Sequence, residues 1–295
     1  MASIRVGISG WRYPPWRGTF YPEDLPQSRE LHYASRNVST IEINGSFYSL
    51  QRPSSYAAWY ADTPEDFIFT VKGPRYITHM LRLRNVEEPL ANFLASGVFN
   101  LQEKLGPILW QFPPNFKYQP EQMAAFLQLL PKDYKAARAI ASKHSSWMKG
   151  RTKFPPNDAR VLRHAVEIRN ESFLDRSFIT LLRDQKVALV IAESARQWPM
   201  PQDITSDFVY MRLHGDEELY RSGYKDAALT RWARRIRAWH RGAEPRDAKR
   251  VASNLKPGAR PRDVYCYFDN TDVKLRAPHD ARSLMRKLRL VSSKQ

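Results

Sequence analysis

The sequence contains one cysteine, Cys266, and therefore cannot form an intrachain disulfide or a multi-cysteine metal site. It also lacks any apolar stretch approaching the ~20 residues that a membrane-spanning helix needs. The first apolar run begins at Ile4 without the charged leader and long hydrophobic region of an export signal. We therefore expect a cytoplasmic protein that does not enter a membrane.

Several motifs of common enzyme classes are missing. No glycine-rich G-x-G-x-x-G turn or P-loop follows the first apolar run, which disfavours an open nucleotide-binding sheet. Ser9 does not fit the G-x-S-x-G elbow of a serine hydrolase. No H-E-x-x-H or H-x-H spacing occurs, and the dispersed His79, His214, Glu167 and Asp269 give only a weak metal signal. We predict no metal site and identify no cofactor.

Acidic residues are scarce relative to basic ones. The chain has 30 Asp and Glu against 47 Lys and Arg, a net charge of +17, which would attract polyanions or phosphorylated metabolites. Basic residues gather in a predicted helix around Leu229–Trp239 and in a proline-rich loop at 242–262. Residues 231–262 are thus a possible nucleic-acid surface, and a solvated surface without a partner is the alternative. Oligomeric state is not readable from these features.

The order of the secondary structure predicts one (β/α)8 TIM-type barrel domain over residues 1–295, of class α/β. Forty-two per cent of the residues are hydrophobic, enough for a buried core. Longer amphipathic segments separate eight strand-like runs, a pattern typical of parallel strands with helical crossovers. These runs are Ile4–Ser9, Thr40–Gly45, Phe67–Lys72, Ile108–Phe112, Ala165–Arg169, Val187–Glu193, Phe208–Leu213 and Val264–Asp269.

The connections between these runs are uneven. A helix is predicted over Glu87–Leu105, where apolar residues recur at helical spacing. The connection after the fourth run is enlarged, with helices expected at Glu121–Leu130 and Tyr134–His144. Pro199 and Pro201 argue against a full helix within Ser194–Asp207, so one crossover should be irregular.

Charged and polar residues occur at the ends of the strand-like runs. Side chains alternate along a strand, so Glu167 and Arg169, or Arg212 and His214, should share a face. Active sites of TIM barrels lie at the carboxyl ends of the strands, where we expect these groups to converge. Three cations facing one cavity would repel unless carboxylates or an anion compensated them. We therefore predict an anion site built from Lys72, Arg169 and Arg212, with Gly215 beside it.

Candidate catalytic residues follow from the same pattern. His214 is the preferred general acid or base, with Glu167 as its partner, and a satisfied buried histidine is the alternative. Glu42 and Glu167 would be a catalytic carboxylate pair in a glycosidase, but ion pairs to Arg169 or Lys72 are favoured. Aromatic residues that follow the first two runs would stack a sugar or base, or equally form a hydrophobic lid. They are Trp11, Tyr13, Trp16, Phe47 and Tyr48.

The chain resembles the YecE-like family of TIM-barrel proteins along nearly its whole length. The matching words are Gly7-Ile-Ser-Gly-Trp11-Arg-Tyr13, Phe20-Tyr21-Pro22, Glu42-Ile-Asn44, Phe47-Tyr48, Phe69-Thr-Val-Lys72, Thr78-His79, Gln111-Phe-Pro113-Pro114, Glu167-Ile-Arg169, Arg212-Leu-His214-Gly215 and Tyr267-Phe268-Asp269-Asn270. The resemblance implies the barrel but no settled activity. Asn44, His79, Gln111, Asp269 and Asn270 join the candidate ligand-binding residues through these words. Many relatives have two asparagines where this chain has Asp269-Asn270, and many lack the basic loop.

The leading hypothesis from the sequence is an enzyme, a hydrolase or an isomerase or lyase, that acts on an anionic or phosphorylated small molecule by acid/base chemistry. The alternative is a nucleic-acid-binding protein or phosphodiesterase that uses the basic loop and the arginine-rich helix. A noncatalytic scaffold is the third hypothesis.

Overall fold

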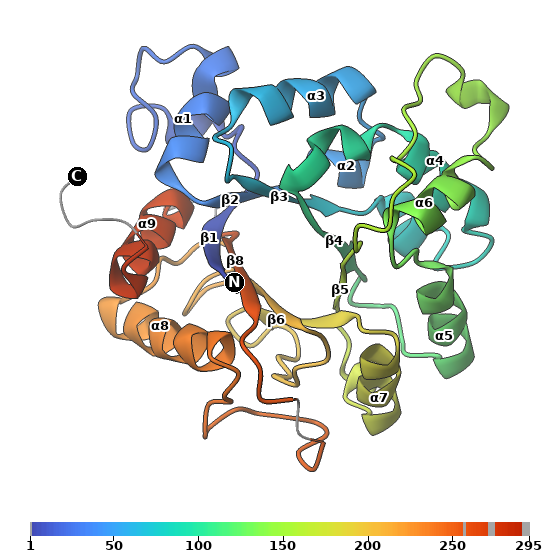
Figure 1. Ribbon diagram of the computed structural model, residues 1–295. Helices are drawn as coiled ribbons and strands as arrows, with labels where there is room; N and C mark the ends of the chain where they lie inside the picture. The colour runs from blue at the N-terminus through green and yellow to red at the C-terminus, as the bar shows by residue number, and fades with distance from the viewer. Residues whose placement is uncertain (1, 256–257, 271–274, 291–295) are drawn as a thin grey trace. The chain divides into compact units, whose positions relative to one another are not determined.

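The computed structural model describes residues 2–255, 258–270 and 275–290. Its eight strands form a closed barrel in chain order, which confirms the predicted TIM-type (β/α)8 fold (Figure 1). Each of the eight strand-like runs overlaps one strand. The strands are β1 (Ile4–Ser9), β2 (Thr40–Ile43), β3 (Ile68–Lys72), β4 (Leu105–Gln111), β5 (His164–Glu167), β6 (Ala188–Glu193), β7 (Phe208–Leu213) and β8 (Asp263–Phe268).

Helices occupy the connections between the strands. They are α1 (Glu30–Asn37), α2 (Gly45–Tyr48), α3 (Pro53–Asp62), α4 (Glu87–Ala95), α5 (Pro120–Leu129), α6 (Tyr134–Ala141), α7 (Arg176–Asp184), α8 (Asp226–His240) and α9 (Ala277–Leu288). The enlarged connection after β4 holds α5 and α6, and 194–207 forms no helix, as predicted. Within the described ranges, none of the helices has the length and apolarity that crossing a bilayer requires.

The predicted helix over Glu87–Leu105 is wrong beyond Ala95. The chain leaves α4 at Gly97, whose φ of +92° is in the left-handed region that favours glycine. A Cβ there would lie 2.6 Å from the Cα of Pro53, so α3 also requires a glycine at this close approach. The apolar residues that follow continue in a 3-10 turn, Val98–Lys104, and β4 then begins at Leu105.

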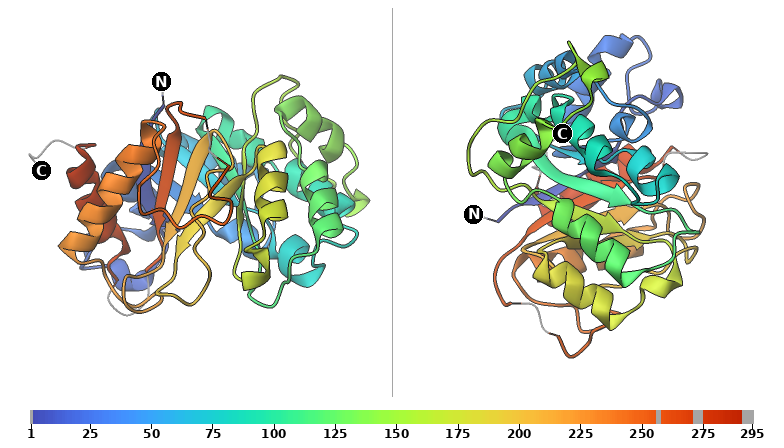
Figure 2. Two further views of the ribbon diagram at one scale, coloured as in Figure 1. Left: turned by 90° about the horizontal axis from the view of Figure 1, so that it is seen from below. Right: turned by 90° about the vertical axis from the view of Figure 1, so that its right-hand side faces the viewer.

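The chain divides into two compact units. The first consists of the described residues within Met1–Ile41 and Leu174–Gln295, and the second is Glu42–Phe173. In the first unit β6, β7, β8 and β1 pair in parallel, and α8 and α9 pack together beside these strands (Figure 2). The tryptophans Trp232 and Trp239 are buried on α8, as its sequence pattern predicts.

In the second unit β3, β4 and β5 pair in parallel, and α4 packs against α6. Its core is aromatic. Trp110 on β4 contacts Phe93 and Phe126 edge-on, and its indole Nε1 donates to the Nδ1 of buried His164 at 3.1 Å. The other ring nitrogen of His164 donates to the carbonyl of Pro131 at 2.8 Å, so this histidine is a satisfied core residue.

The basic loop at 242–262 is attached to the first unit through several of its described residues. Asp203 accepts two backbone N–H groups of the loop, from Val251 at 2.7 Å and Ala252 at 3.0 Å. Arg250 forms an ion pair with Glu244, and the Arg262 side chain is buried. Lys256 and Pro257 lie outside the described residues. Part of the loop's positive charge thus serves to hold the loop in place.

Candidate functional site

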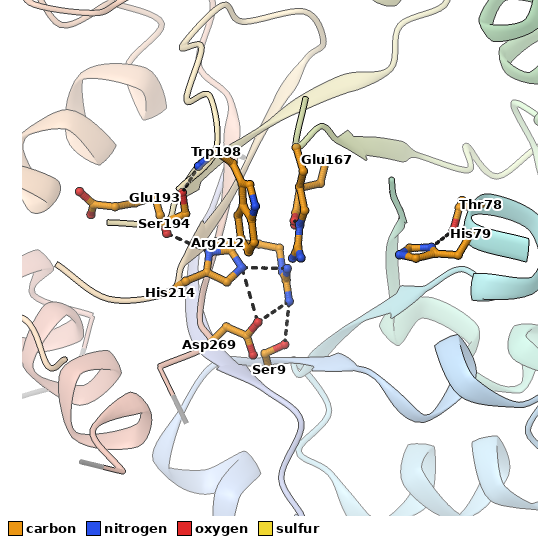
Figure 3. A network of polar contacts seen from close by, with 11 residues as sticks. Ser9, Thr78, His79, Glu167, Glu193, Ser194, Trp198, Arg212, His214 and Asp269 are labelled. Atoms are coloured by element: carbon orange, nitrogen blue, oxygen red, sulfur yellow. Dashed lines mark hydrogen bonds and ion pairs between the residues drawn. The ribbon is translucent and has the colours of Figure 1, made fainter. Parts of the chain in front are cut away.

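Arg212 is the centre of a buried polar cluster in the first unit (Figure 3). It is the penultimate residue of β7, and its side chain is 1% exposed. Its guanidinium donates to Asp269 Oδ2 at 2.8 Å, to His214 Nε2 at 3.0 Å and to Ser9 Oγ at 3.3 Å. The strand ends of β1, β7 and β8 therefore bring together Arg212, His214 and Asp269, three of the residues predicted from the sequence.

The contacts of His214 determine where its proton lies. Nδ1 is 2.9 Å from the backbone carbonyl of Glu193, which only accepts, so Nδ1 carries the hydrogen. Nε2 then accepts the N–H of Arg212. Trp198 and Tyr220 contact the ring edge-on, with centroids 5.6 and 5.3 Å away, and His214 is fully buried. Both ring nitrogens of His214 therefore form hydrogen bonds within the protein, one with Arg212 and one with the carbonyl of Glu193.

Glu193, the last residue of β6, is a functional group that we did not select from the sequence. Its side chain points away from the Arg212 cluster, and Oε2 accepts the indole N–H of Trp232 at 2.8 Å (Figure 3). Burial, and secondarily the charge of Asp216, raise the pKa of Glu193 to about 7, against the lowering effect of the Trp232 hydrogen bond. In the sequence, Glu193 could have been selected because it is the last residue of a strand-like run, the same feature by which the other candidates were selected.

Gly215 and Asn270 belong to a network that fixes the loop after β7. The Gly215 N–H donates to the Tyr224 hydroxyl at 3.0 Å, and Tyr224 N–H donates to Asp280 on α9. Asn270 Nδ2 donates to Asp280 at 2.9 Å and to the carbonyl of Ser222 at 3.1 Å. Gly215 has a φ of +134°, and a Cβ there would lie 2.2 Å from the carbonyl oxygen of Glu218.

In the second unit, Glu167 and Arg169 form the ion pair that the sequence favoured. Arg169 Nε donates to Glu167 Oε1 at 2.8 Å, and the two side chains are 11% and 0% exposed. Gln111 at the end of β4 is buried and lies directly opposite Glu167 in the β4–β5 register. A carboxylate, a guanidinium and a carboxamide are therefore held at neighbouring strand ends.

Lys72, the last residue of β3, lies beside an aromatic ring and a histidine. Its Nζ is 4.2 Å from the centroid of Phe47, a cation–π contact, and Phe47 also contacts His79 edge-on at 5.1 Å. Desolvation, and then the charges of Lys72, Arg169 and Arg75, lower the pKa of His79 to about 4, while Glu167 acts in the opposite direction. His79 is consequently neutral at pH 7.

The local sequence explains how His79 reaches this position. Gly73 follows β3, and a Cβ there would lie 2.5 Å from the Trp110 ring, so only glycine allows this close approach. The chain then forms a π-helical turn, Tyr76–Met80, a geometry that is frequent at functional sites. Thr78 Oγ1 lies 2.8 Å from His79 Nδ1 and fixes the ring (Figure 3). His79 Nε2 has no hydrogen-bond partner among the described residues.

The remaining sequence candidates fall into buried and exposed groups. Glu42 at the end of β2 is fully buried, and Asn44 follows it at the start of α2. Trp11 is buried, and its carbonyl accepts the Tyr21 hydroxyl at 2.6 Å. Tyr48 is 67% exposed. Trp11 and the Arg212 cluster belong to the first unit. The second unit contains Glu42, Lys72, His79, Gln111 and Arg169. That both sets of residues line one active-site opening stays a prediction.

Metal ligands do not cluster in the part of the chain that the structure describes. No three His, Cys, Asp or Glu side chains there are arranged to hold an ion. The sole cysteine, Cys266, is buried in β8, and burial raises the pKa of its thiol.

The fold and the charged groups at its strand ends define a TIM-barrel protein with polar clusters at the carboxyl ends of the strands. Residues 5–295 match the family model described as "Protein of unknown function DUF72". The chain belongs to this family, which confirms the resemblance seen in the sequence.

Similar proteins agree with this assignment. The chain is 23% identical to the UPF0759 protein YecE of Escherichia coli O157:H7, over 82% of this chain and 84% of that one. It is 30% identical to UPF0759 protein YunF of Bacillus subtilis (strain 168), over 41% of this chain and 44% of YunF. Among solved structures, a DUF72 family protein from Thermotoga maritima matches with a TM-score of 0.71 at 23% identity, over 97% of this chain and 99% of that one. These similarities support the fold and specify no chemistry.

Proposed function

We propose that the protein is an enzyme that acts on an anionic or phosphorylated small molecule by acid/base chemistry at the carboxyl ends of its barrel strands. The observation that carries the proposal is the group of basic side chains near His79: Lys72 Nζ lies 4.2 Å from the centroid of Phe47, whose ring contacts His79, and the charges of Lys72, Arg169 and Arg75 all act on His79. Glu167, which is paired with Arg169, acts on His79 in the opposite direction. A bound anion would receive charge-assisted hydrogen bonds from such basic side chains.

His79 is suited to transfer a proton in such a site. Thr78 orients the ring through Nδ1, and Nε2 has no partner among the described residues, so it is available to a ligand. Without an anion, burial and then the repulsion from Lys72, Arg169 and Arg75 hold the pKa of His79 near 4. Binding of an anion would cancel part of this repulsion and raise the pKa toward neutrality, where an acid/base group works best. The assignments of His214, Glu42 and Glu167 to catalysis stay predictions.

Replacement of Lys72 by methionine should weaken binding of inorganic phosphate about ten- to a hundredfold, the effect of losing one charged hydrogen bond. Methionine is nearly as long as lysine and loses the cation–π contact with Phe47, but its thioether can still pack against that ring, so the fold should be retained. Isothermal titration calorimetry measures the affinity, and Lys135→Met, at an exposed position on α6, is the matched control. Equal phosphate affinity in wild type and Lys72→Met would contradict the proposed anion site.

The same variant tests the electrostatics of His79. In NMR titrations of the ligand-free protein, Lys72→Met should raise the pKa of His79 from about 4, because one of the repelling cations is removed. Saturating phosphate should raise the pKa of His79 in the wild type. If phosphate binds and the pKa of His79 does not move, the anion lies elsewhere and His79 is not part of the site.

A further inference from the structure

Exposed apolar side chains gather on the segments that follow β2 and β3 in the second unit. Tyr48 at the end of α2 is 67% exposed, and Tyr76 and Met80 on the π-helical turn are 48% and 63% exposed. Single exposed apolar residues are ordinary on protein surfaces. These three are unusual because they lie on the two short segments that also supply Phe47 and His79 to the proposed anion site.

Tyr48 has two ring contacts and is otherwise mostly exposed. The guanidinium carbon of Arg75 lies 5.5 Å from the ring centroid, over one face. The ring of Phe47 meets Tyr48 edge-on, with centroids 5.1 Å apart. Because the Tyr48 side chain is 67% exposed despite these two contacts, it offers aromatic surface for stacking.

The open ring and the anion site share one contact residue. Phe47 touches the Tyr48 ring, and the same Phe47 ring lies 4.2 Å from Lys72 Nζ. Arg75 also links the two: its guanidinium lies over the Tyr48 ring, and its charge lowers the pKa of His79. A ligand with an anionic group at Lys72 and a flat ring on Tyr48 therefore needs only a short linker, such as one pentose.

We propose that Tyr48 is a stacking subsite for the base of a mononucleotide whose phosphate binds at Lys72, Arg75 and Arg169. The inference rests on the proposed anion site and specifies its substrate class. A tyrosine face accepts any base because every base has a π-face. An arginine on the far side of the tyrosine ring stabilises the stack and, with the net charge of +17, favours a phosphorylated ligand.

The test compares three ligands by isothermal titration calorimetry: adenosine 5′-monophosphate, ribose 5-phosphate and inorganic phosphate. Wild type should bind the nucleotide at least about fivefold more tightly than ribose 5-phosphate, the lower range of base stacking on an aromatic side chain. Tyr48→Leu should abolish this preference and keep the affinity for ribose 5-phosphate and phosphate. Tyr48→Phe, which retains the ring, should keep the preference. Trp147→Leu, at an aromatic residue that is 58% exposed elsewhere in the same unit, is the control.

The outcomes separate the two proposals. If none of the three ligands binds, the proposed anion site is overturned. If all three bind with equal affinity, or if Tyr48→Leu keeps the preference for the nucleotide, the anion site stands and the base subsite is overturned. Binding of an oligothymidylate far more tightly than the mononucleotide, with a steep dependence on salt, would also overturn it, because the surface would then serve single-stranded nucleic acid.

Discussion

Replacement of Arg212 by leucine is expected to lower the free energy of unfolding by about 3–5 kcal/mol, the usual cost of removing one partner from a buried ion pair. The guanidinium donates to Asp269, His214 and Ser9, and its side chain is 1% exposed. Leucine would leave the Asp269 carboxylate without its cation and His214 Nε2 without its donor. Urea unfolding followed by circular dichroism measures the loss.

Three comparisons make this prediction specific. Arg212→Lys keeps the charge but cannot reproduce the forked donors, so its cost should lie between those of wild type and Arg212→Leu. The double variant Arg212→Leu, Asp269→Leu should recover part of the stability, because no buried charge is left unpaired. Lys225→Leu breaks an exposed ion pair with Glu217 and should leave the free energy of unfolding almost unchanged. A loss below 1 kcal/mol for Arg212→Leu would show that water replaces these contacts.

The barrel was predictable because parallel strands buried on both faces leave continuous apolar runs in the sequence. Each of the eight runs overlaps a strand, and the bounds of Ile4–Ser9 and Phe208–Leu213 are the same in the structure. The wrong helix end at Gly97 has a tertiary cause. Periodicity continues past Ala95, and the requirement for a left-handed residue beside Pro53 depends on a contact between segments distant in the chain.

The sequence predicted which types of residue form the candidate site, but it predicted their individual roles less well. Alternation correctly placed Arg212 and His214 together, but the donor and acceptor pattern that engages both His214 nitrogens depends on Glu193 O, 21 residues away. Sequence also did not distinguish Trp16, which is fully buried, from Tyr48, which is mostly exposed. The pKa of His79 is low because of burial first and then because of the charges of Lys72, Arg169 and Arg75, and this combination arises only in the folded chain.

Replacement of Glu193 by glutamine should raise stability at pH 8 by about 1–3 kcal/mol and leave it nearly unchanged below pH 4.5. Burial raises the pKa of Glu193 to about 7 from the ordinary value of 4.5, so the folded state binds this proton more tightly than the unfolded state. The stability that Glu193 contributes is fully present below pH 4.5 and is lost as the pH rises through 7. Glutamine is neutral throughout and still accepts the Trp232 N–H.

The measurement is the difference in unfolding free energy between Glu193→Gln and wild type from pH 4.5 to pH 8. Taking the difference matters because His79 and His164, both with a pKa lowered to about 4, give the opposite trend and lose stability as the pH falls below 6.5. Both proteins share these histidines, so their contribution cancels. Glu23→Gln, at an exposed glutamate of the same unit, should show no such difference. A Glu193→Gln difference that is constant over this range would mean that Glu193 is already ionised in the folded protein at pH 4.5, held by a partner that outweighs its burial.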